Sequence, residues 1–255
     1  MKRQEGLRQK YNLGMDEKGI RINKYLAECG VCSRRGADEL IDRGEVVVDG
    51  EKAVTGMKIF PGMEVRVRGK VISGIDDKVY LAFNKPRGIV CTSEKMEEKN
   101  VIDYLNYPKR ITYCGRLDKD SEGLLIMTND GDLIDSMMRS RNEHEKEYEV
   151  TVNKTVTDAF LYKLSKGVFL EELNVTTKKC KVERISDRSF KIVLTQGLNR
   201  QIRRMCEAFG YRVRKLVRVR VMNVKLGNLE SGKYRELTAD EVRELRRLCG
   251  VPSVS

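Results

Sequence analysis

The chain has no tryptophan, one histidine and only 4 prolines in 255 residues. Its longest unbroken apolar run is Val79 to Phe83, and the charged first ten residues lead into no apolar segment. A membrane-spanning helix needs about 20 apolar residues, and a secretory signal peptide needs an apolar region of roughly 7–15. We therefore expect neither feature, and we expect a cytoplasmic protein.

Metal-binding patterns are also scarce. Of seven cysteines only Cys29 and Cys32 have C-x-x-C spacing, and no second pair matches them. A closed zinc site needs four ligands, whereas His144 is the single histidine. We expect no metal, free reduced thiols, and a surface position for His144, because persistent disulfides belong to oxidising compartments.

What the chain does have is positive charge, with a formal net charge of +12 and a pI near 9.3. Between Thr195 and Arg235 there are 11 Lys or Arg and 2 Glu, a local balance of +9. A concentrated basic segment is typical of proteins that neutralise phosphates. A membrane surface attracts the same charge, but no amphipathic basic terminus is present. Nucleic acid is therefore the expected partner.

The patterning predicts two domains, and 40% hydrophobic residues suffice for a core. We expect an α+β chain with these parts: an N-terminal extension at 1–19, a small module at 20–68, a linker at 69–78 that lacks periodicity, and a larger domain at 79–250.

Within the small module a short helix is expected at Asn23–Cys29, and Ser33 can cap a second helix. A strand at Val46–Val48 then turns at Asp49-Gly50, a dipeptide suited to a type I′ turn. In the EVRVR stretch two valines alternate with arginines, which predicts another strand.

The larger domain combines strand and helix patterns. Strands are expected in VYLAFNKPRGIV, EKEYEVTV, FKIVLTQG and RVRKLVRVRVMNV, with helices in AFLYKLSKG and RQIRRMCEAFG. Thr238 and Glu241 have the spacing of a capping box at the start of a last helix. This order predicts a mixed, mostly antiparallel sheet.

An acid-rich stretch, GRLDKDSEGLLIMTNDG, stands out in this basic chain at residues 115–131. A calcium loop fits poorly, because its fifth and twelfth positions hold Glu122 and Asn129. A purely structural turn, with Asp130 leading from a strand into a helix, is a second possibility. In the third, Leu124–Met127 forms a buried strand that holds Asp118 rigidly as a catalytic carboxylate.

The helix in RQIRRMCEAFG supplies a cation for that carboxylate. Its apolar residues recur with helical spacing, so one face is buried. Arg203 lies at the edge of that face, where it can reach a cleft, whereas Arg200 and Arg204 point away to solvent or phosphate. A carboxylate beside such a guanidinium stays ionised at neutral pH.

The stretch RVRKLVRVRV predicts a basic strand face. Its even positions hold Arg212, Arg214, Arg218 and Arg220, and most of its odd positions hold valine. A regular strand therefore exposes the arginines on one side, unless a bulge near Leu216 interrupts the pattern. An ordinary solvated strand face is the alternative.

The segment IRINKYLAECGVCSRRGADELIDRGEVVVDG resembles an S4 RNA-binding domain. The resemblance implies that its basic residues face folded RNA, and the candidates are Arg21, Lys24, Arg34, Arg35 and Arg43. Arg34 and Arg35 are favoured, because the first N–H groups of a helix also attract phosphate. Alternatively these charges only solvate helix faces.

GRLDKDSEGLLIMTNDG, KEYEV and GLNRQIRRMCEAFG resemble consecutive motifs of the RsuA branch of pseudouridine synthases, over about residues 20–248. The resemblance implies that Asp118 is the essential aspartate and Arg203 its basic partner. It also implies that Arg116 supports a flipped nucleotide, that Tyr148 packs on the base and that Leu216 lies beneath it. Without the resemblance, Tyr148 is as well explained as a half-buried core tyrosine.

The family implies isomerisation of a uridine in RNA without a cofactor. HEKEYEVTV, TKKCKV and RVMNVKL resemble members that act on large-subunit (23S) ribosomal RNA, with transfer RNA as a possible second substrate and a monomer as the default. Whether the aspartate attacks the sugar, attacks the base or removes a sugar proton stays open. The rivals are a noncatalytic RNA-binding or ribosome-assembly factor and a nucleoside hydrolase. The candidate RNA-binding residues are Arg116, Leu216, Arg34, Arg35, Lys24, Arg200, Arg204, Arg218 and Arg220.

Overall fold

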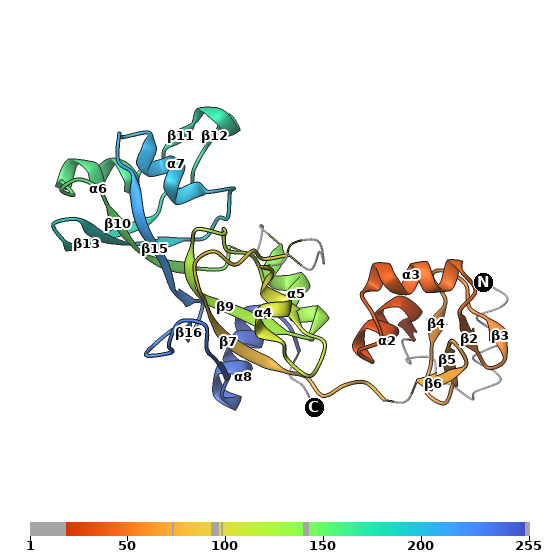
Figure 1. Ribbon diagram of the computed structural model, residues 1–255. Coiled ribbons are helices and arrows are strands. Elements are labelled where there is room, and N and C mark those ends of the chain that lie inside the picture. The colour runs from red at the N-terminus through yellow and green to blue at the C-terminus, as the bar shows by residue number, and fades with distance from the viewer. Residues whose placement is uncertain (1–18, 73, 93–96, 98, 140–142, 253–255) are drawn as a thin grey trace. The chain divides into compact units, whose positions relative to one another are not determined.

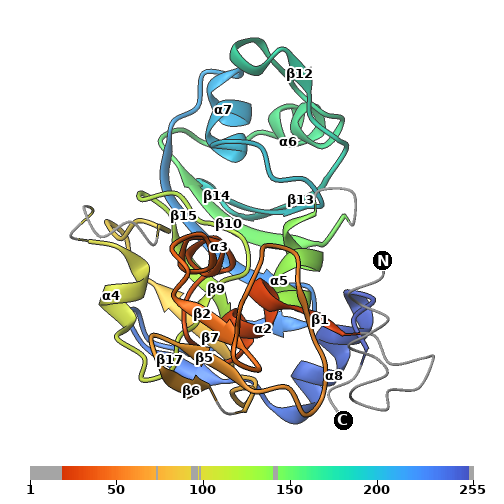
Figure 2. The ribbon, with the colours of Figure 1, turned by 90° about the vertical axis from the view of Figure 1, so that its right-hand side faces the viewer.

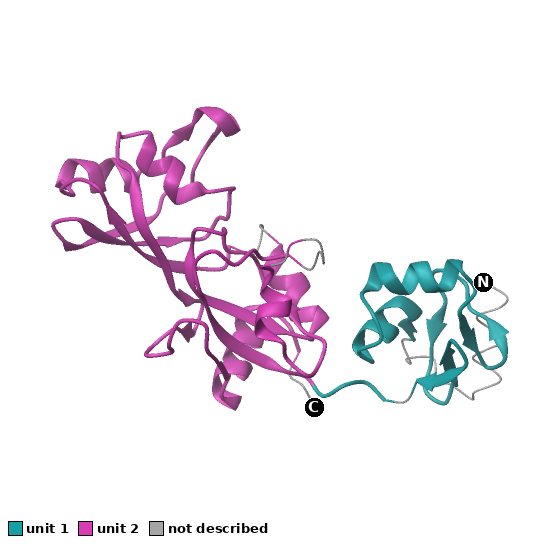
Figure 3. Ribbon diagram, viewed as in Figure 1, with its two compact units in different colours: residues 1–77 teal, residues 78–255 magenta. Residues whose placement is uncertain are grey.

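The computed structural model describes residues 19–72, 74–92, 97, 99–139 and 143–252. The chain divides into two compact units, with the boundary between Asp77 and Lys78 (Figure 3). Apart from Gly19, the N-terminal extension predicted at 1–19 lies outside the described residues. No helix in the described ranges is long and apolar enough to cross a membrane.

The first unit combines two helices with short strands (Figure 1). Its elements are β1 (Ile20–Arg21), α2 (Ile22–Glu28), α3 (Arg34–Asp42), β2 (Val46–Val48), β3 (Glu51–Lys52), β4 (Lys58–Ile59), β5 (Val65–Val67) and β6 (Lys70–Ile72). The predicted cap is present, because Ser33 Oγ accepts a hydrogen bond from Gly36 N at 2.9 Å. The predicted turn is present too, with positive φ at both Asp49 (50°) and Gly50 (85°).

One sheet, in the order β3-β2-β5-β6, supports the core of this unit. Ile22 and Leu26 of α2 pack with the buried residues of α3 and the valines of β2 and β5. The linker predicted from residue 69 is wrong in its first part, because β5 turns into β6 at Arg68-Gly69. An exposed edge strand of three residues carries too little apolar periodicity to be read from sequence.

The second unit is built around a larger sheet (Figure 1). Its elements are β7 (Tyr80–Lys85), α4 (Val101–Leu105), β8 (Thr112–Tyr113), β9 (Glu122–Thr128), α5 (Gly131–Met138), β10 (Lys146–Val152), α6 (Asp158–Ser165), β11 (Phe169–Leu170), the 3₁₀ turn η2 (Glu171–Leu173), β12 (Val175–Thr176), β13 (Lys181–Ser186), β14 (Ser189–Leu194), α7 (Gln201–Glu207), β15 (Val213–Val221), β16 (Val224–Lys225), β17 (Tyr234–Glu236) and α8 (Ala239–Leu248).

The main path of this sheet runs β13-β14-β10-β15-β9-β7-β17. Its described strand pairs are antiparallel except β15 with β9, which matches the predicted mixed, mostly antiparallel architecture. That parallel contact contains only two residue pairs, Val217 with Glu122 and Arg218 with Gly123. The sheet therefore consists of two halves that meet at a short junction.

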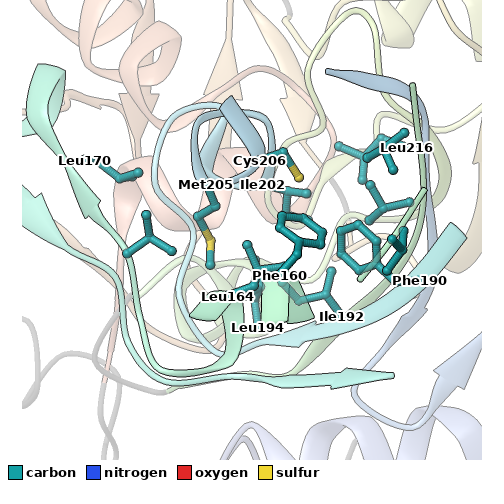
Figure 4. Packing of buried hydrophobic residues seen from close by; sticks show 14 residues of the cluster. Phe160, Leu164, Leu170, Phe190, Ile192, Leu194, Ile202, Met205, Cys206 and Leu216 are labelled. Atoms are coloured by element: carbon teal, nitrogen blue, oxygen red, sulfur yellow. The ribbon is translucent and has the colours of Figure 1, made fainter. Parts of the chain in front are cut away.

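Helices α6 and α7 cover one face of the β13-β14-β10-β15 half (Figures 1 and 2). Figure 4 shows their contact with the sheet, where Phe160 and Leu164 of α6 lie close to Phe190 and Ile192 of β14. Ile202, Met205 and Cys206 of α7 complete this cluster. The packing fixes α7, and with it the loop that precedes α7, over the sheet.

In the other half β9 is buried on both faces, which explains its continuous apolar run. Leu124 and Ile126 pack with α5 and α8, whereas Leu125 and Met127 pack with α4. Figure 2 shows α4 on one side of β7 and β9, with α5 and α8 on the other. The buried strand predicted at Leu124–Met127 is confirmed, each residue being 0% exposed.

Asp130 ends this strand region and caps α5, accepting from Asp132 N at 3.2 Å. Its carboxylate also accepts hydrogen bonds from Tyr80 Oη, at 2.8 Å, and from the Arg246 guanidinium. Burial, followed by the hydrogen bond to Asp130, raises the pKa of Tyr80. One acid of the acid-rich stretch at residues 115–131 is thus structural, as a buried partner of α8. The predicted capping box of α8, between Thr238 and Glu241, is also present.

Replacing Arg246 should test this buried pair. Arg246→Met leaves the buried Asp130 carboxylate without its cation, so we expect the free energy of unfolding to fall by about 3–5 kcal/mol. Arg247→Met is the matched control, because Arg247 is 67% exposed beside Glu244 and should matter little. Urea unfolding of both variants measures the difference, and equal losses would contradict the assignment.

Candidate active site

The second unit contains a cleft of about 320 Å³. Its walls come from the segment before β9, the end of α5, strands β10 and β15, and the loop between β14 and α7. Among the predicted site residues, the cleft is lined by Arg116, Asp118, Tyr148, Arg200, Leu216 and Arg218. Residues far apart in sequence therefore meet at one place, close to the junction of the two half-sheets.

Asp118 stands on a turn held from several sides. Its own carbonyl accepts from Ser121 N at 3.0 Å, and the carbonyl of Lys119 accepts from Gly88 N at 2.8 Å. The preceding residue, Leu117, is buried against the β9 cluster. Asp118 itself is half-buried at the cleft. The rigid mount predicted for this carboxylate is what the backbone contacts provide.

Lys85 supports the same region, although the sequence patterns did not single it out. Its side chain is fully buried, and Nζ donates to the carbonyls of Pro86 at 3.0 Å and Ile89 at 2.8 Å. Burial lowers the pKa of Lys85. Because Gly88 N holds the carbonyl of Lys119, this lysine braces the turn that carries Asp118.

Tyr148 lies at the centre of β10, between Ile192 of β14 and Arg218 of β15. It is half-buried, packs on the clusters of both half-sheets and also lines the cleft. The two expectations for this tyrosine are therefore compatible: its ring contributes to the core and also forms part of the cleft wall.

The basic face predicted for β15 is wrong beyond Arg214. The pairing of β15 with β10 shifts register at Thr151/Val152 and at Glu147/Tyr148 of β10. At these two bulges Arg214 and Val219 of β15 have no paired residue in β10. Arg212 and Arg214 are exposed. Between the two bulges the phase reverses, because a bulge adds one unpaired residue. Leu216 is therefore buried, at 5% exposed, and Arg218 is buried at 2%.

Arg218 and Arg220 therefore do not form an exposed row of arginines that could bind phosphates. Arg218 donates to backbone carbonyls inside the protein. Arg220 donates to Glu147 at 2.9 Å and to Glu145 at 3.1 Å. Both guanidiniums are engaged by the protein itself, which alternation alone could not indicate.

Arg203 is buried at the start of α7, at 7% exposed. Its Nη2 donates to the backbone carbonyl of Asp120 at 2.9 Å. Among the described residues no salt bridge joins Arg203 to Asp118. Instead of the expected direct pair, Arg203 binds the backbone of Asp120, in the same turn. Burial and then the charge of Arg200 lower the pKa of Arg203, while the two aspartates oppose this shift.

The other two arginines of this helix behave differently from each other. Arg200 has a left-handed backbone (φ 50°), is exposed, lines the cleft and lies 3.8 Å from an Asp120 carboxylate oxygen. Arg204 is ion-paired with Glu172 and donates to the carbonyl of Asn199 at 3.1 Å. Arg204 is therefore held within the protein, whereas Arg200 faces the cleft as a cation.

The sequence patterns misplaced one cleft residue, His144, and did not indicate another, Lys146. His144, expected on the surface, is buried at 6% exposed and lies 3.2 Å from the carbonyl of Ser136 through Nε2. Burial lowers its pKa. Lys146 lines the cleft, and its Nζ donates to the carbonyl of His144 at 3.0 Å. Sequence could have found Lys146, because it precedes Tyr148 by two residues and so shares its strand face.

Charge in the cleft is strongly unequal. Among the described residues that line it, five are cationic and one is acidic: Arg116, Arg139, Lys146, Arg200 and Arg218, against Asp118. Burial, followed by the charge of Arg218, lowers the pKa of Lys146 to about 8. Such a field attracts anions and leaves a single carboxylate for chemistry.

No group of three metal-binding side chains occurs among the described residues. The seven cysteines, all among the described residues, are thiols and not disulfides, as predicted. The calcium-loop alternative for residues 118–129 thus has no supporting cluster, and Asp118 has no neighbouring acid on the cleft wall among the described residues.

The model of the family described as RNA pseudouridylate synthase matches residues 79–208. The S4 domain model matches residues 20–65. The chain is 48% identical to the dual-specificity RNA pseudouridine synthase RluF of Escherichia coli strain K12, covering 92% of this chain and 81% of that protein. The chain belongs to the RNA pseudouridylate synthase family.

Two further relatives agree. Ribosomal large subunit pseudouridine synthase B of Bacillus subtilis is 36% identical, over 89% of this chain and 96% of that protein. A crystal structure titled as a pseudouridylate synthase superposes with a TM-score of 0.65 at 28% identity, covering 89% of this chain and 99% of that one. This pseudouridine synthase therefore shares both fold and sequence with the family over most of its length.

The S4 domain of this synthase carries its predicted cations on helices α2 and α3 of the first unit and directly beside them. Arg21 and Arg35 are exposed, and Arg34 is half-buried at the start of α3. Lys24 Nζ lies 3.8 Å from Glu28, and Arg43 donates to Glu45 at 2.9 Å. Exposure of Arg21 and Arg35 is compatible with RNA contact, which stays a prediction.

The lowered pKa of Lys146 gives a pH test. Because this pKa is about 8, the synthase should lose one cleft cation as pH rises through that value, and kcat/KM should fall. Lys146→Arg keeps the charge at high pH, so its profile should stay flat between about pH 7 and 9. His144 does not interfere, since its lowered pKa places its titration below that range. An identical alkaline limb in both proteins would contradict the assignment.

Proposed function

We propose that this synthase converts a uridine of large-subunit ribosomal RNA to pseudouridine in the cleft. The observation that carries the proposal is one carboxylate, Asp118, facing a lining that otherwise has five cations and the ring of Tyr148. The cations attract phosphates, and the Tyr148 ring offers an aromatic surface to an unstacked base. Asp118 is the group available to form and break bonds.

In the isomerisation the N1–C1′ bond of the uridine breaks, a C5–C1′ bond forms, the hydrogen on C5 leaves as a proton, and N1 takes up a proton, so the composition is unchanged. Oxidation state is unchanged, so the proposal needs no cofactor. Asp118 acts as nucleophile at C1′ or C6, or as base at the sugar. Each route requires the carboxylate to be held beside the target nucleotide, so a fixed position of the Asp118 turn serves all three.

The target base must first leave its stack. Flipping costs a few kcal/mol, which phosphate contacts at Arg116, Arg200 and Lys146 offset. Tyr148 and Leu216 then provide apolar contact for the flipped uracil. Glycoside hydrolysis commonly uses two carboxylates and an activated water, whereas one acid lines the described cleft. This difference favours isomerisation over hydrolysis.

The substrate class follows from two sources. The Bacillus subtilis relative is named for the large ribosomal subunit, and the S4 domain supports binding of folded RNA. The name of the RluF relative states dual specificity, so we propose transfer RNA as a second substrate. We propose the monomer as the acting form, since the groups assigned to the chemistry all belong to one unit of the chain.

The central test uses ribosomal RNA labelled with tritium at uridine C5. The synthase should release tritium to water without free uracil, and Asp118→Asn should reduce release to background with RNA affinity nearly intact. Asp120→Asn is the matched control: this neighbouring carboxylate does not line the cleft and should keep most of the turnover. The same assay with transfer RNA tests the second substrate.

Other outcomes of that assay are decisive. Free uracil would show a hydrolase. RNA binding with release of neither product would show a noncatalytic RNA-binding factor. Full turnover by the Asp118 variant would remove the carboxylate from the mechanism.

A second prediction concerns the S4 domain. Residues 78–255 alone keep every cleft residue but lose one of two RNA-binding modules, so KM should rise on the order of 10²-fold. The rate at saturating RNA should stay close to that of the full chain. Steady-state kinetics of both proteins make the comparison, and loss of the saturated rate would show that the two units do not act separately.

A further inference from the structure

Arg218 occupies the junction between the two half-sheets. Across β15 its Cα is paired with Tyr148 of β10 on one side and with Gly123 of β9 on the other. Asp118 approaches the cleft from the β9 half, and Tyr148 belongs to the β10 half. The two groups that must face the same uracil are therefore carried by different halves, and Arg218 lies between them.

The side chain of Arg218 binds the segment that bears Asp118. Its Nε donates to the carbonyl of Leu124 at 2.7 Å, and its Nη1 lies 3.4 Å from the carbonyl of Arg116. These carbonyls flank Asp118, one before and one after it in sequence. The guanidinium thus holds both ends of the turn at once.

Burial sets this residue apart from a phosphate ligand. It is 2% exposed, and its Nη2 is buried with no partner among the described residues. It also lines the cleft. A fully buried guanidinium gains little by contact with a mobile RNA backbone, but its planar fork can fix two backbone acceptors at once.

The backbone of Arg218 makes an equally close contact. Gly123 has φ +104°, and a Cβ there would lie 2.4 Å from the Arg218 carbonyl oxygen and 2.7 Å from its nitrogen. Only glycine allows β9 to approach β15 this closely. Backbone and side chain of Arg218 therefore hold the same segment, by independent contacts.

We propose that Arg218 is a positioning residue, which sets the Asp118 carboxylate against the Tyr148 ring across the junction. The inference rests on the proposed function, because it assigns Asp118 and Tyr148 to one reacting base. The guanidinium acts through the backbone at Arg116 and Leu124, and it is not a phosphate-binding group.

Lysine cannot replace this arrangement fully. Its single ammonium on a flexible stem can reach one carbonyl, whereas the arginine fork reaches two. A positioning role therefore predicts partial rescue by lysine. A role that depends only on charge in the cleft predicts full rescue, and a role only in stability predicts an unchanged rate in the folded protein.

The test compares Arg218→Met, Arg218→Lys and Arg246→Met with the full-length wild type in the tritium assay. Arg246 is the matched control, since it is also a buried arginine, 8% exposed, but binds Asp130 and Pro252. Rates are measured under single turnover at saturating RNA, well below the Tm of every variant. RNA affinity and Tm are measured in parallel.

We expect Arg218→Met to lower the single-turnover rate about 10²-fold, the cost of roughly 1 Å of misplacement. RNA affinity should stay close to that of the wild type, and Arg218→Lys should fall between the two. Arg246→Met should lower Tm while keeping the rate.

Gly123→Ala provides a second variant that leaves the guanidinium in place. The added methyl group meets backbone atoms of Arg218, so β9 and β15 must separate. We expect the same loss of rate with nearly unchanged RNA affinity. If Arg218→Met does not fold, Arg218→Lys and Gly123→Ala carry the test.

The outcomes separate this inference from the proposed function. An inactive wild type would overturn the proposed function. If the wild type is active and the folded Arg218 and Gly123 variants react at the wild-type rate, the inference is overturned and the proposed function stands. Weaker RNA binding by the Arg218 variants at an unchanged rate would also overturn the inference, because it shows contact with RNA. Full rescue by lysine would do the same, because it shows a role of charge alone.

Discussion

The parallel contact between β9 and β15 is the constraint on which the site depends. It joins the two half-sheets through only two residue pairs. Asp118 enters the cleft from one half, and Tyr148, Lys146 and Leu216 from the other. A change in the spacing of these halves moves the carboxylate relative to everything it has to face. The close approach at Gly123 and the buried side chain of Arg218 both act at this contact.

Around the junction, buried cations support the backbone instead of binding solvent. Lys85, Arg203 and Arg218 all donate to main-chain carbonyls of the segments next to Asp118. Desolvation of such groups is costly unless each finds an acceptor. Backbone carbonyls meet part of that need, and they do so without adding a second carboxylate to the described cleft lining, so Asp118 is the one acid among its positive charges.

Local sequence signals predicted much of the fold. Ser33 caps α3 and the Thr238 capping box opens α8, because both signals act within one helical turn. Asp49-Gly50 makes the predicted turn, and the apolar run Leu124–Met127 forms the strand buried on both faces. The family motifs further indicated which aspartate faces the cleft, since Asp118 lines it together with Arg116 and Tyr148.

Local sequence determined most of the main strands and helices and the fold class, because periodicity and caps act over a few residues, and the family motifs pointed to the residues proposed to carry the chemistry. Tertiary structure decided how the cations are used. Two bulges in β15 turned Arg218 inward, helix packing brought Arg203 to the Asp120 carbonyl, and burial enclosed His144. Such outcomes depend on strand register and on acceptors distant in sequence, which no alternation pattern specifies.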